Sequence, residues 1–179
     1  EAEMEAALAK IVAIARQHRV STIRESKSAM ETAAIWKGRK SAFGATGRIA
    51  DYICMDGTIP RKRLHEVLRR IAELSTKHGL RVANVFHAGD GNLHPLILFD
   101  RRERPQLERA LGAATEILKE SVRLGGVVSG EHGIGVEKRD YMDILFTTAD
   151  LAAMAGLRRS FDPRELFNPG KVFPARKGC

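Results

Sequence analysis

Two histidines, His87 and His94, flank a polar turn in the segment "NVFHAGDGNLHPLILF" (residues 84–99). Apolar, β-prone sequence lies on both sides, and the intervening Gly, Asp and Asn residues favour a tight turn. If the two strands pair so that His87 faces His94, the Cβ atoms lie about 4.5 to 5.5 Å apart on one side of the sheet. This separation suits two imidazoles that bind one metal ion.

A second candidate pair, Glu131 and His132, lies in the glycine-rich segment "SGEHGIG" (residues 129–135). Two histidines and a glutamate form a ligand set for zinc, iron or manganese that leaves a position open for water or substrate. Side chains of adjacent residues in an extended segment point in opposite directions. We therefore expect Glu131 to bind the ion and His132 to act as a base, since an imidazole accepts a proton near neutrality.

The competing interpretation of these histidines is structural. A histidine beside an apolar run is commonly a core residue that is satisfied by a backbone hydrogen bond. Two paired histidines together with a Glu-His pair weigh against this interpretation. His18, His65 and His78 lie in helical patterns, and we assign them structural roles.

The elements that must position these residues mix helices with an antiparallel strand pair, so the sequence predicts an α+β fold with helices on one face of the sheet. "LRVANVFHA" and "LHPLILFD" form the hairpin, and "ADYICM" and "VSTI" are further strand candidates. Apolar residues at helical spacing predict helices over residues 2–18, 27–37, 61–78, 103–124, 137–145 and 148–161.

Composition limits the function classes. The chain has 179 residues and a formal net charge of +8, which suits nucleic acid, an anionic membrane surface or acidic substrates. Aromatic residues make up only 6%, and the arginines of "RKRLHEVLRR" lie opposite an apolar helix face, so nucleic-acid binding is disfavoured. No apolar run approaches the roughly 20 residues of a membrane-spanning helix.

The termini and cysteines bear on localisation. Cys54 and Cys179 lack CxxC spacing, which favours a reducing compartment and hence the cytoplasm. The first residues, "EAEMEAALAK", are acidic and helical, unlike a secretory signal, and the chain does not start with methionine. We expect it to be part of a longer protein.

Three segments, "HAGDGNLHP", "SGEHGIGVEKR" and "FDPRELFNPGKVFP", resemble in order and spacing the C-terminal part of FAD-linked 2-hydroxyacid oxidases and dehydrogenases of the vanillyl-alcohol-oxidase type. The style of "IWKGRKSAFGATGRI" and "YICMDGTIP" is similar to the flavin-carrying subunit of bacterial glycolate oxidases. The resemblance covers essentially the whole chain. It implies an α+β cap over about residues 1–125, followed by a site loop and helical tail over about residues 126–179.

The resemblance also implies roles for individual residues. His87, His94 and Glu131 match the family's metal ligands, and His132 matches the base that takes the substrate's hydroxyl proton while hydride leaves for the flavin. Arg39 in "WKGRK" corresponds to the arginine that binds the substrate carboxylate, and Asn168 in "FNPGK" to a segment that returns toward the flavin. The alternatives are an exposed arginine and a tail that only packs on the core.

Cofactor, substrate and partners follow from the same resemblance. The resemblance implies FAD that is bound mainly by an N-terminal domain. This chain itself has neither GxGxxG nor GxxxxGK[ST] spacing. Relatives that act on dicarboxylates place a threonine and a lysine where this chain has Phe43 and Cys54, which favours a small monocarboxylate such as glycolate or lactate. Other oxidase subunits, including an iron-sulfur protein, are the expected partners, and the isolated chain is expected to be inactive and to self-associate through uncovered apolar surface.

Two other functions fit the residues. A stand-alone metal-dependent hydrolase would use the same ligands and a metal-bound water. A non-catalytic assembly module would use the basic surface to contact other subunits or an anionic membrane.

Overall fold

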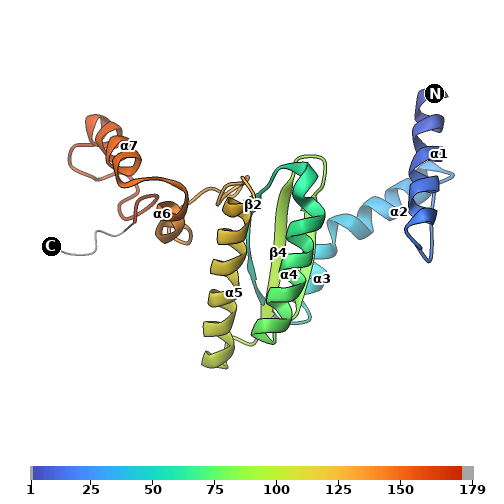
Figure 1. Cartoon of the computed structure of the whole chain (residues 1–179), viewed down its shortest axis with the longest axis horizontal. Coiled ribbons are helices and arrows are strands. Elements are labelled where there is room, and N and C mark those ends of the chain that lie inside the picture. Colours follow the sequence, from blue (N-terminus) through green and yellow to red (C-terminus); the bar gives the residue numbers. More distant parts are fainter. Residues whose placement is uncertain (1, 175–179) are drawn as a thin grey trace. The chain divides into compact units, whose positions relative to one another are not determined.

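The computed structural model describes residues 2–174, so Cys179 lies outside the described residues. The chain divides into two compact units, residues 1–42 and 43–179 (Figure 1). The first contains α1 (Ala2–Gln17) and α2 (Ala29–Lys40), and α3 (Ala42–Gly47) begins at the boundary. This division differs from the predicted division into a cap (about residues 1–125) and a site loop with a helical tail (about residues 126–179). The predicted division stays a prediction.

The N-terminal unit confirms two predicted helices and corrects one predicted strand. Ser28 caps α2, because its side chain accepts a hydrogen bond from the Glu31 backbone N–H at 3.2 Å. The segment "VSTI" forms no strand, and every described strand comes from residues 51–99. Its β-branched residues have no neighbouring strand with which to pair, and local propensity alone does not make a strand.

The second unit contains a four-stranded antiparallel sheet, which confirms the predicted α+β class. Its central strand, β4 (Asn92–Phe99), pairs with β3 (Val82–His87) on one side. On the other side it pairs with β1 (Asp51–Cys54) and β2 (Gly57–Thr58) in turn. The hairpin expected from the sequence thus supplies the central strand, β4, and one edge strand, β3.

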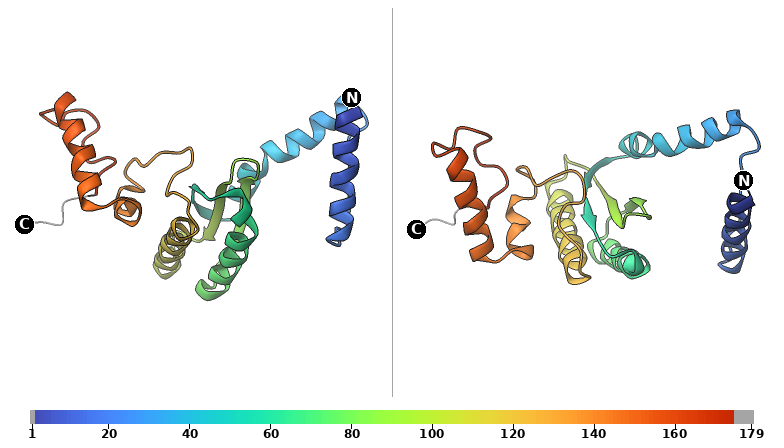
Figure 2. Two further views of the ribbon diagram at one scale, coloured as in Figure 1. Left: turned by 45° about the horizontal axis from the view of Figure 1, so that its top comes forward. Right: turned by 90° about the horizontal axis from the view of Figure 1, so that it is seen from above.

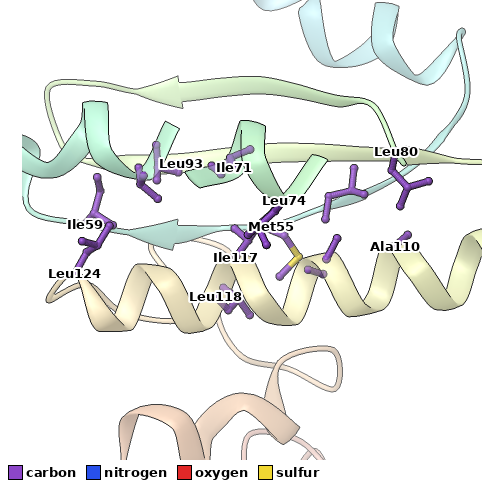
Figure 3. Packing of buried hydrophobic residues seen from close by; sticks show 14 of the residues in the cluster. Met55, Ile59, Ile71, Leu74, Leu80, Leu93, Ala110, Ile117, Leu118 and Leu124 are labelled. Atoms are coloured by element: carbon purple, nitrogen blue, oxygen red, sulfur yellow. The ribbon is translucent and has the colours of Figure 1, made fainter. Parts of the chain in front are cut away.

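One face of the sheet carries the hydrophobic core (Figure 3). The helices α4 (Leu64–His78) and α5 (Arg104–Arg123) pack side by side on this face, as predicted (Figures 1 and 2). A 3₁₀ turn, η1 (Arg61–Arg63), precedes α4, and Gly79 ends it in a left-handed conformation. The largest fully buried side chains of the core are Val67, Ile71, Leu74, Ile97, Ile117 and Leu118.

The C-terminal part of this unit is helical. A short turn, η2 (Arg139–Tyr141), leads into α6 (Met142–Leu145) and then into α7 (Thr148–Phe161). Thr147 and Asp150 form a capping box that fixes the start of α7. Among the described residues, no helix has the length and apolar character that a membrane span requires.

Candidate functional site

The register of the hairpin places His87 and His94 on the same face of the sheet, opposite to the core. His87 pairs with Asn92 and His94 pairs with Val85, so the expected direct pairing of the two histidines is wrong. The residue opposite His87 is Asn92, which lies two residues before His94 on β4. The two histidines are therefore diagonal neighbours. Their ring centroids lie 5.5 Å apart with the ring planes at 89°.

The turn itself requires glycine at position 91. Gly91 has a φ of 76°, and a Cβ there would lie 2.2 Å from the Ile59 carbonyl oxygen. The Gly91 carbonyl also accepts a hydrogen bond from the Ile59 N–H at 2.9 Å. Close approach to the segment after β2 therefore fixes where the hairpin ends.

Asp56 lies opposite His94 across the sheet edge. Cys54 of β1 pairs with Leu96, and Gly57 of β2 pairs with Leu93. Because the same register continues between these two pairs, Asp56 lies opposite His94. Asp56 Oδ1 is 3.9 Å from His94 Nδ1, and the two side chains are 0% and 2% exposed. Asp56 was not among the predicted site residues, because nothing in the sequence indicates that this carboxylate is buried.

The loop of residues 129–132 wraps around the Asp56 carboxylate. Asp56 Oδ2 accepts hydrogen bonds from the Ser129 hydroxyl at 2.8 Å and the His132 N–H at 2.8 Å. It also lies 3.1 Å from the Gly130 N–H and 3.2 Å from the Glu131 N–H. One buried carboxylate thus satisfies three successive backbone donors, and this gives the loop its shape.

Lys138 completes this cluster. Its buried ammonium group lies 2.9 Å from Asp56 Oδ2 and also donates to the Asp56 carbonyl and the Ser129 hydroxyl, each at 3.2 Å. Burial raises the pKa of Asp56, but the hydrogen bonds from Lys138, His132 and Ser129 outweigh it and hold this pKa well below its usual range. Asp56 is therefore a carboxylate whose charge Lys138 offsets.

Glycine at position 130 lets the loop approach the sheet. A Cβ on Gly130 would lie 2.4 Å from Asn92 Oδ1 and 2.8 Å from Thr58 Cγ2. The Gly130 N–H donates to the Asp56 carbonyl at 3.0 Å, and Val127 forms an antiparallel bridge with Thr58, so this segment runs along the outer edge of β2. This contact brings the loop beside the histidine-bearing face.

The side chains of the loop and the hairpin meet at Glu131. Glu131 Oε1 is 2.9 Å from His94 Nε2, 3.8 Å from His87 Nε2 and 3.9 Å from His132 Nε2. The His132 ring stacks on His94 with centroids 5.0 Å apart. Glu131 and His132 therefore do not point apart as expected for an extended segment, because the turn around Asp56 directs both side chains to the same place.

The donor atoms at this point fit a divalent cation. Ligand atoms of Asp56, His94, Glu131 and His132 lie within 4.8 Å of one another, and a second set consists of Cys54, His94 and His132. His87 belongs to neither set among the described residues, but it borders the cluster, because its Nε2 lies 3.8 Å from Glu131 Oε1 and its ring lies edge-to-face with the His94 ring. Nitrogen and carboxylate oxygen donors suit zinc, iron or manganese.

The buried ring of His94 supports this fit. Its Nε2 faces Glu131, while Nδ1 faces Asp56 and has no hydrogen-bond partner among the described residues. A neutral imidazole carries one N–H and cannot donate to two carboxylates. A cation shared by His94 Nε2 and Glu131 would remove this conflict and leave the N–H for Asp56.

Burial also sets the ionisation of the cluster. Burial lowers the pKa of His94, and the nearby His132 lowers it further, against the opposing charges of Glu131 and Asp56. Burial, followed by the Asp56 charge, raises the pKa of the Cys54 thiol to about 11. Both groups are thus neutral near pH 7, which for His94 is the protonation state that binds a metal.

A cavity opens beside His132. Its volume is about 490 Å³, and its lining joins an apolar wall from β1 and α5 to polar groups of Glu137, Lys138 and Tyr141. Cys54 also lines this cavity, and the Phe43 ring lies 5.8 Å from the His94 ring on an edge-to-face approach. A small molecule in the cavity would reach His132.

Arg39 and Asn168 are the other two predicted site residues, and they lie in segments other than the hairpin and the loop. Arg39 belongs to α2 of the N-terminal unit, where its guanidinium lies 5.7 Å from the centre of the Trp36 ring. Asn168 has a φ of 47°, and its Oδ1 accepts a hydrogen bond from Lys171 Nζ at 3.0 Å. Their assignments to the substrate carboxylate and to the flavin stay predictions.

Comparison with known proteins shows the family to which the chain belongs. The model of the family "FAD linked oxidases, C-terminal domain" matches residues 1–172. Glycolate oxidase subunit GlcD of Escherichia coli is 49% identical over 158 residues, which are 88% of this chain and 32% of that protein.

More distant relatives agree. Glycolate oxidase subunit GlcD of Bacillus subtilis is 34% identical over 165 residues, 92% of this chain and 35% of that protein. D-lactate dehydrogenase of Archaeoglobus fulgidus is 37% identical over 120 residues, 66% of this chain and 26% of that protein. The chain spans about a third of the length of the curated relatives it matches. It belongs to the family of FAD linked oxidases, as a C-terminal domain.

Proposed function

We propose that this chain is the C-terminal part of an FAD-dependent oxidoreductase that oxidises glycolate or a similar small 2-hydroxy acid to the 2-oxo acid. The family and the names of the relatives support an oxidoreductase of this kind. The observation that carries the proposal is that the imidazole of His132 stacks on His94, with its Nε2 atom 3.9 Å from Glu131 Oε1. An imidazole that can accept a proton thus lies beside His94 and Glu131, the two groups that we assign to the metal ion.

Each residue of the site has a distinct proposed role in the oxidation. His94 and Glu131 would hold a divalent cation, with His87 beside them, and a bound cation would supply Lewis-acid chemistry that lowers the pKa of a substrate hydroxyl. His132 accepts the hydroxyl proton. Bound flavin supplies the hydride acceptor, and most of its binding residues lie in sequence that precedes this chain, with Asn168 as a contact from the tail.

Charge at the site favours an anionic substrate. Lys138 offsets Asp56, so Glu131 alone balances a divalent cation in this cluster, and the site stays positive. Arg39 adds a guanidinium fork that binds a carboxylate in a bidentate manner, where lysine would not. A 2-hydroxy acid presents both groups that such a site binds, a carboxylate and a hydroxyl.

The substrate is small. Phe43 and Cys54, which lie beside His94, are uncharged side chains and offer no partner for a second carboxylate. This supports glycolate or lactate over a dicarboxylate.

Partners and location extend the proposal. We infer that the full protein works with other oxidase subunits, including an iron-sulfur protein, in the cytoplasm or at the inner membrane. Exposed apolar side chains on α1 and α2, such as Ile11, Ile14 and Trp36, provide surface for such contacts or for self-association of the chain.

The test is flavin reduction in the longer protein that the proposal requires. Anaerobic addition of glycolate or D-lactate is expected to bleach the flavin, whereas acetate, which lacks the hydroxyl, leaves it oxidised. His132→Gln is expected to slow reduction by about 10² to 10⁴-fold, with His65→Gln as the matched control. Ester hydrolysis with added Zn²⁺ but without flavin would support the hydrolase instead, and unchanged turnover in His87→Ala and His94→Ala would support the assembly module.

A further inference from the structure

The carboxylate of Asp56, which is not among the residues predicted from the sequence, is fully buried and accepts several hydrogen bonds. It belongs to the interruption between β1 and β2, and it accepts from four donors of a loop that lies more than 70 residues later in the sequence. A carboxylate with 0% exposure and this many donors is unusual for a turn.

We propose that Asp56 is the positioning residue of the site: its Oδ2 holds the loop of residues 129–132 so that Glu131 and His132 face His94, and its Oδ1 fixes the orientation of the His94 ring. This inference rests on the proposed roles of Glu131, His94 and His132. It adds a residue that acts through them.

The first part of this role concerns the loop. The N–H groups of Gly130, Glu131 and His132 all point at the Asp56 carboxylate, so the two functional side chains leave the loop from backbone that Asp56 holds. Ser129 reinforces the arrangement, because its hydroxyl donates to Asp56 and contacts the Gly133 carbonyl at 3.1 Å. Without the carboxylate, the Glu131 and His132 N–H groups lose their acceptor, while the Gly130 N–H keeps the Asp56 carbonyl at 3.0 Å.

The second part concerns the His94 ring. Asp56 Oδ1 is the nearest charged group to the unpartnered Nδ1, at 3.9 Å, while Nε2 faces Glu131. Histidines that bind metals commonly direct their other ring N–H to a carboxylate, which fixes the tautomer. Asp56 is placed to favour the tautomer with the proton on Nδ1 and the lone pair on Nε2.

Lys138 offsets the energetic cost of burying the charged Asp56 carboxylate. Lys138 is 5% exposed, and its ammonium group contacts both the carboxylate and the backbone carbonyl of Asp56. A buried carboxylate without such a partner would be strongly destabilising. The ion pair therefore lets Asp56 stay charged beneath the site.

The test compares Asp56→Asn with Asp150→Asn in the ¹⁵N-labelled 179-residue chain. Asp150 is a matched control, because its carboxylate also accepts a backbone N–H and a hydroxyl, in the capping box of α7. The readouts are thermal unfolding, Co²⁺ affinity and the ¹⁵N signals of the histidine rings. Ring signals report the tautomer directly and need neither flavin nor turnover.

We expect Asp56→Asn to weaken Co²⁺ binding about 10- to 100-fold and to shift the ring signals of His94 and His132 in the metal-free chain. Asp150→Asn is expected to lower thermal stability without either change. A folded Asp56→Asn chain with unaltered ring signals and Co²⁺ affinity would overturn the inference.

Ser129→Ala keeps the test decisive if Asp56→Asn does not fold. This variant removes one donor to Asp56 and is expected to move the amide signals of residues 130–132 and the His94 ring in the same direction, by a smaller amount. No change in those signals would contradict the role. If instead the wild-type chain binds no Co²⁺ while the ring signals still depend on Asp56, the proposed function fails and the positioning role stands.

Discussion

His94 Nε2 lies 2.9 Å from Glu131 Oε1, so a buried imidazole of the central strand meets a half-exposed carboxylate of a distant loop. The strand is rigid because it pairs on both sides, and the loop is held by Asp56. This contact joins the two sequence motifs into one site.

Gly130→Ala should disturb the site by steric conflict. The added Cβ would meet Asn92 Oδ1 and Thr58 Cγ2 at distances that ordinary packing does not allow, so the loop must move away from the sheet. We expect a loss of about 1 to 3 kcal/mol in the free energy of unfolding, measured by urea denaturation.

Gly44→Ala is the control for this substitution. Gly44 lies in α3 with open space around it, and alanine there should leave stability unchanged or raise it by up to about 1 kcal/mol. Equal effects of the two substitutions would show that the close approach at Gly130 is unimportant.

The Cys54 thiol should react slowly with alkylating reagents. Burial raises its pKa to about 11 from a reference of 9.0, so the thiolate fraction near neutrality falls by about 100-fold. Because the thiolate is the nucleophile, the rate should rise about tenfold per pH unit until the pH approaches 11. Iodoacetamide labelling of the Cys179→Ser chain, beside a peptide of residues 50–58, measures this.

A plateau in that rate near the pKa of the peptide would mean that the fold does not shelter the thiol. Rapid labelling of the folded chain near neutrality would likewise contradict the raised pKa of the Cys54 thiol.

Asp56 should contribute stability that acid removes. Its pKa is lower in the folded chain than the reference of 3.8, so the contribution is present above about pH 4 and is lost as the pH falls. Near pH 7, Asp56→Asn leaves Lys138 without its counter-charge in the interior and should cost about 3 to 5 kcal/mol. The measurement is urea unfolding of both chains across this range.

The difference in unfolding free energy between the two chains should shrink toward about pH 3. A difference that stays constant with pH would show that Asp56 has the same pKa in both states.

Much of the fold was predictable because periodic apolar patterns determine which helix faces are buried. The helix predicted at 148–161 is α7, whose start the Thr147 capping box fixes, and the predicted hairpin is β3 and β4. The strand predicted at 20–23 failed because a strand needs a partner, which composition does not reveal.

The site was only partly predictable. The sequence indicated His94, Glu131 and His132 as chemically suited residues, and the structure brings them together. It did not reveal the diagonal register of His87, because the turn is set by the contact of Gly91 with Ile59. Asp56 and Lys138 were missed because their importance comes from burial against a loop distant in sequence.

The most direct test of the site is calorimetric titration of Zn²⁺ into the purified chain and its variants. The wild-type chain should bind a single ion, whereas His94→Ala and Glu131→Gln should each weaken binding by more than about 100-fold, since they remove ligands. His65→Ala, an exposed histidine of α4, should bind as the wild type does. Equal Zn²⁺ binding by the wild type and both ligand variants, or none by any of them, would contradict the convergence of hairpin and loop on one metal ion.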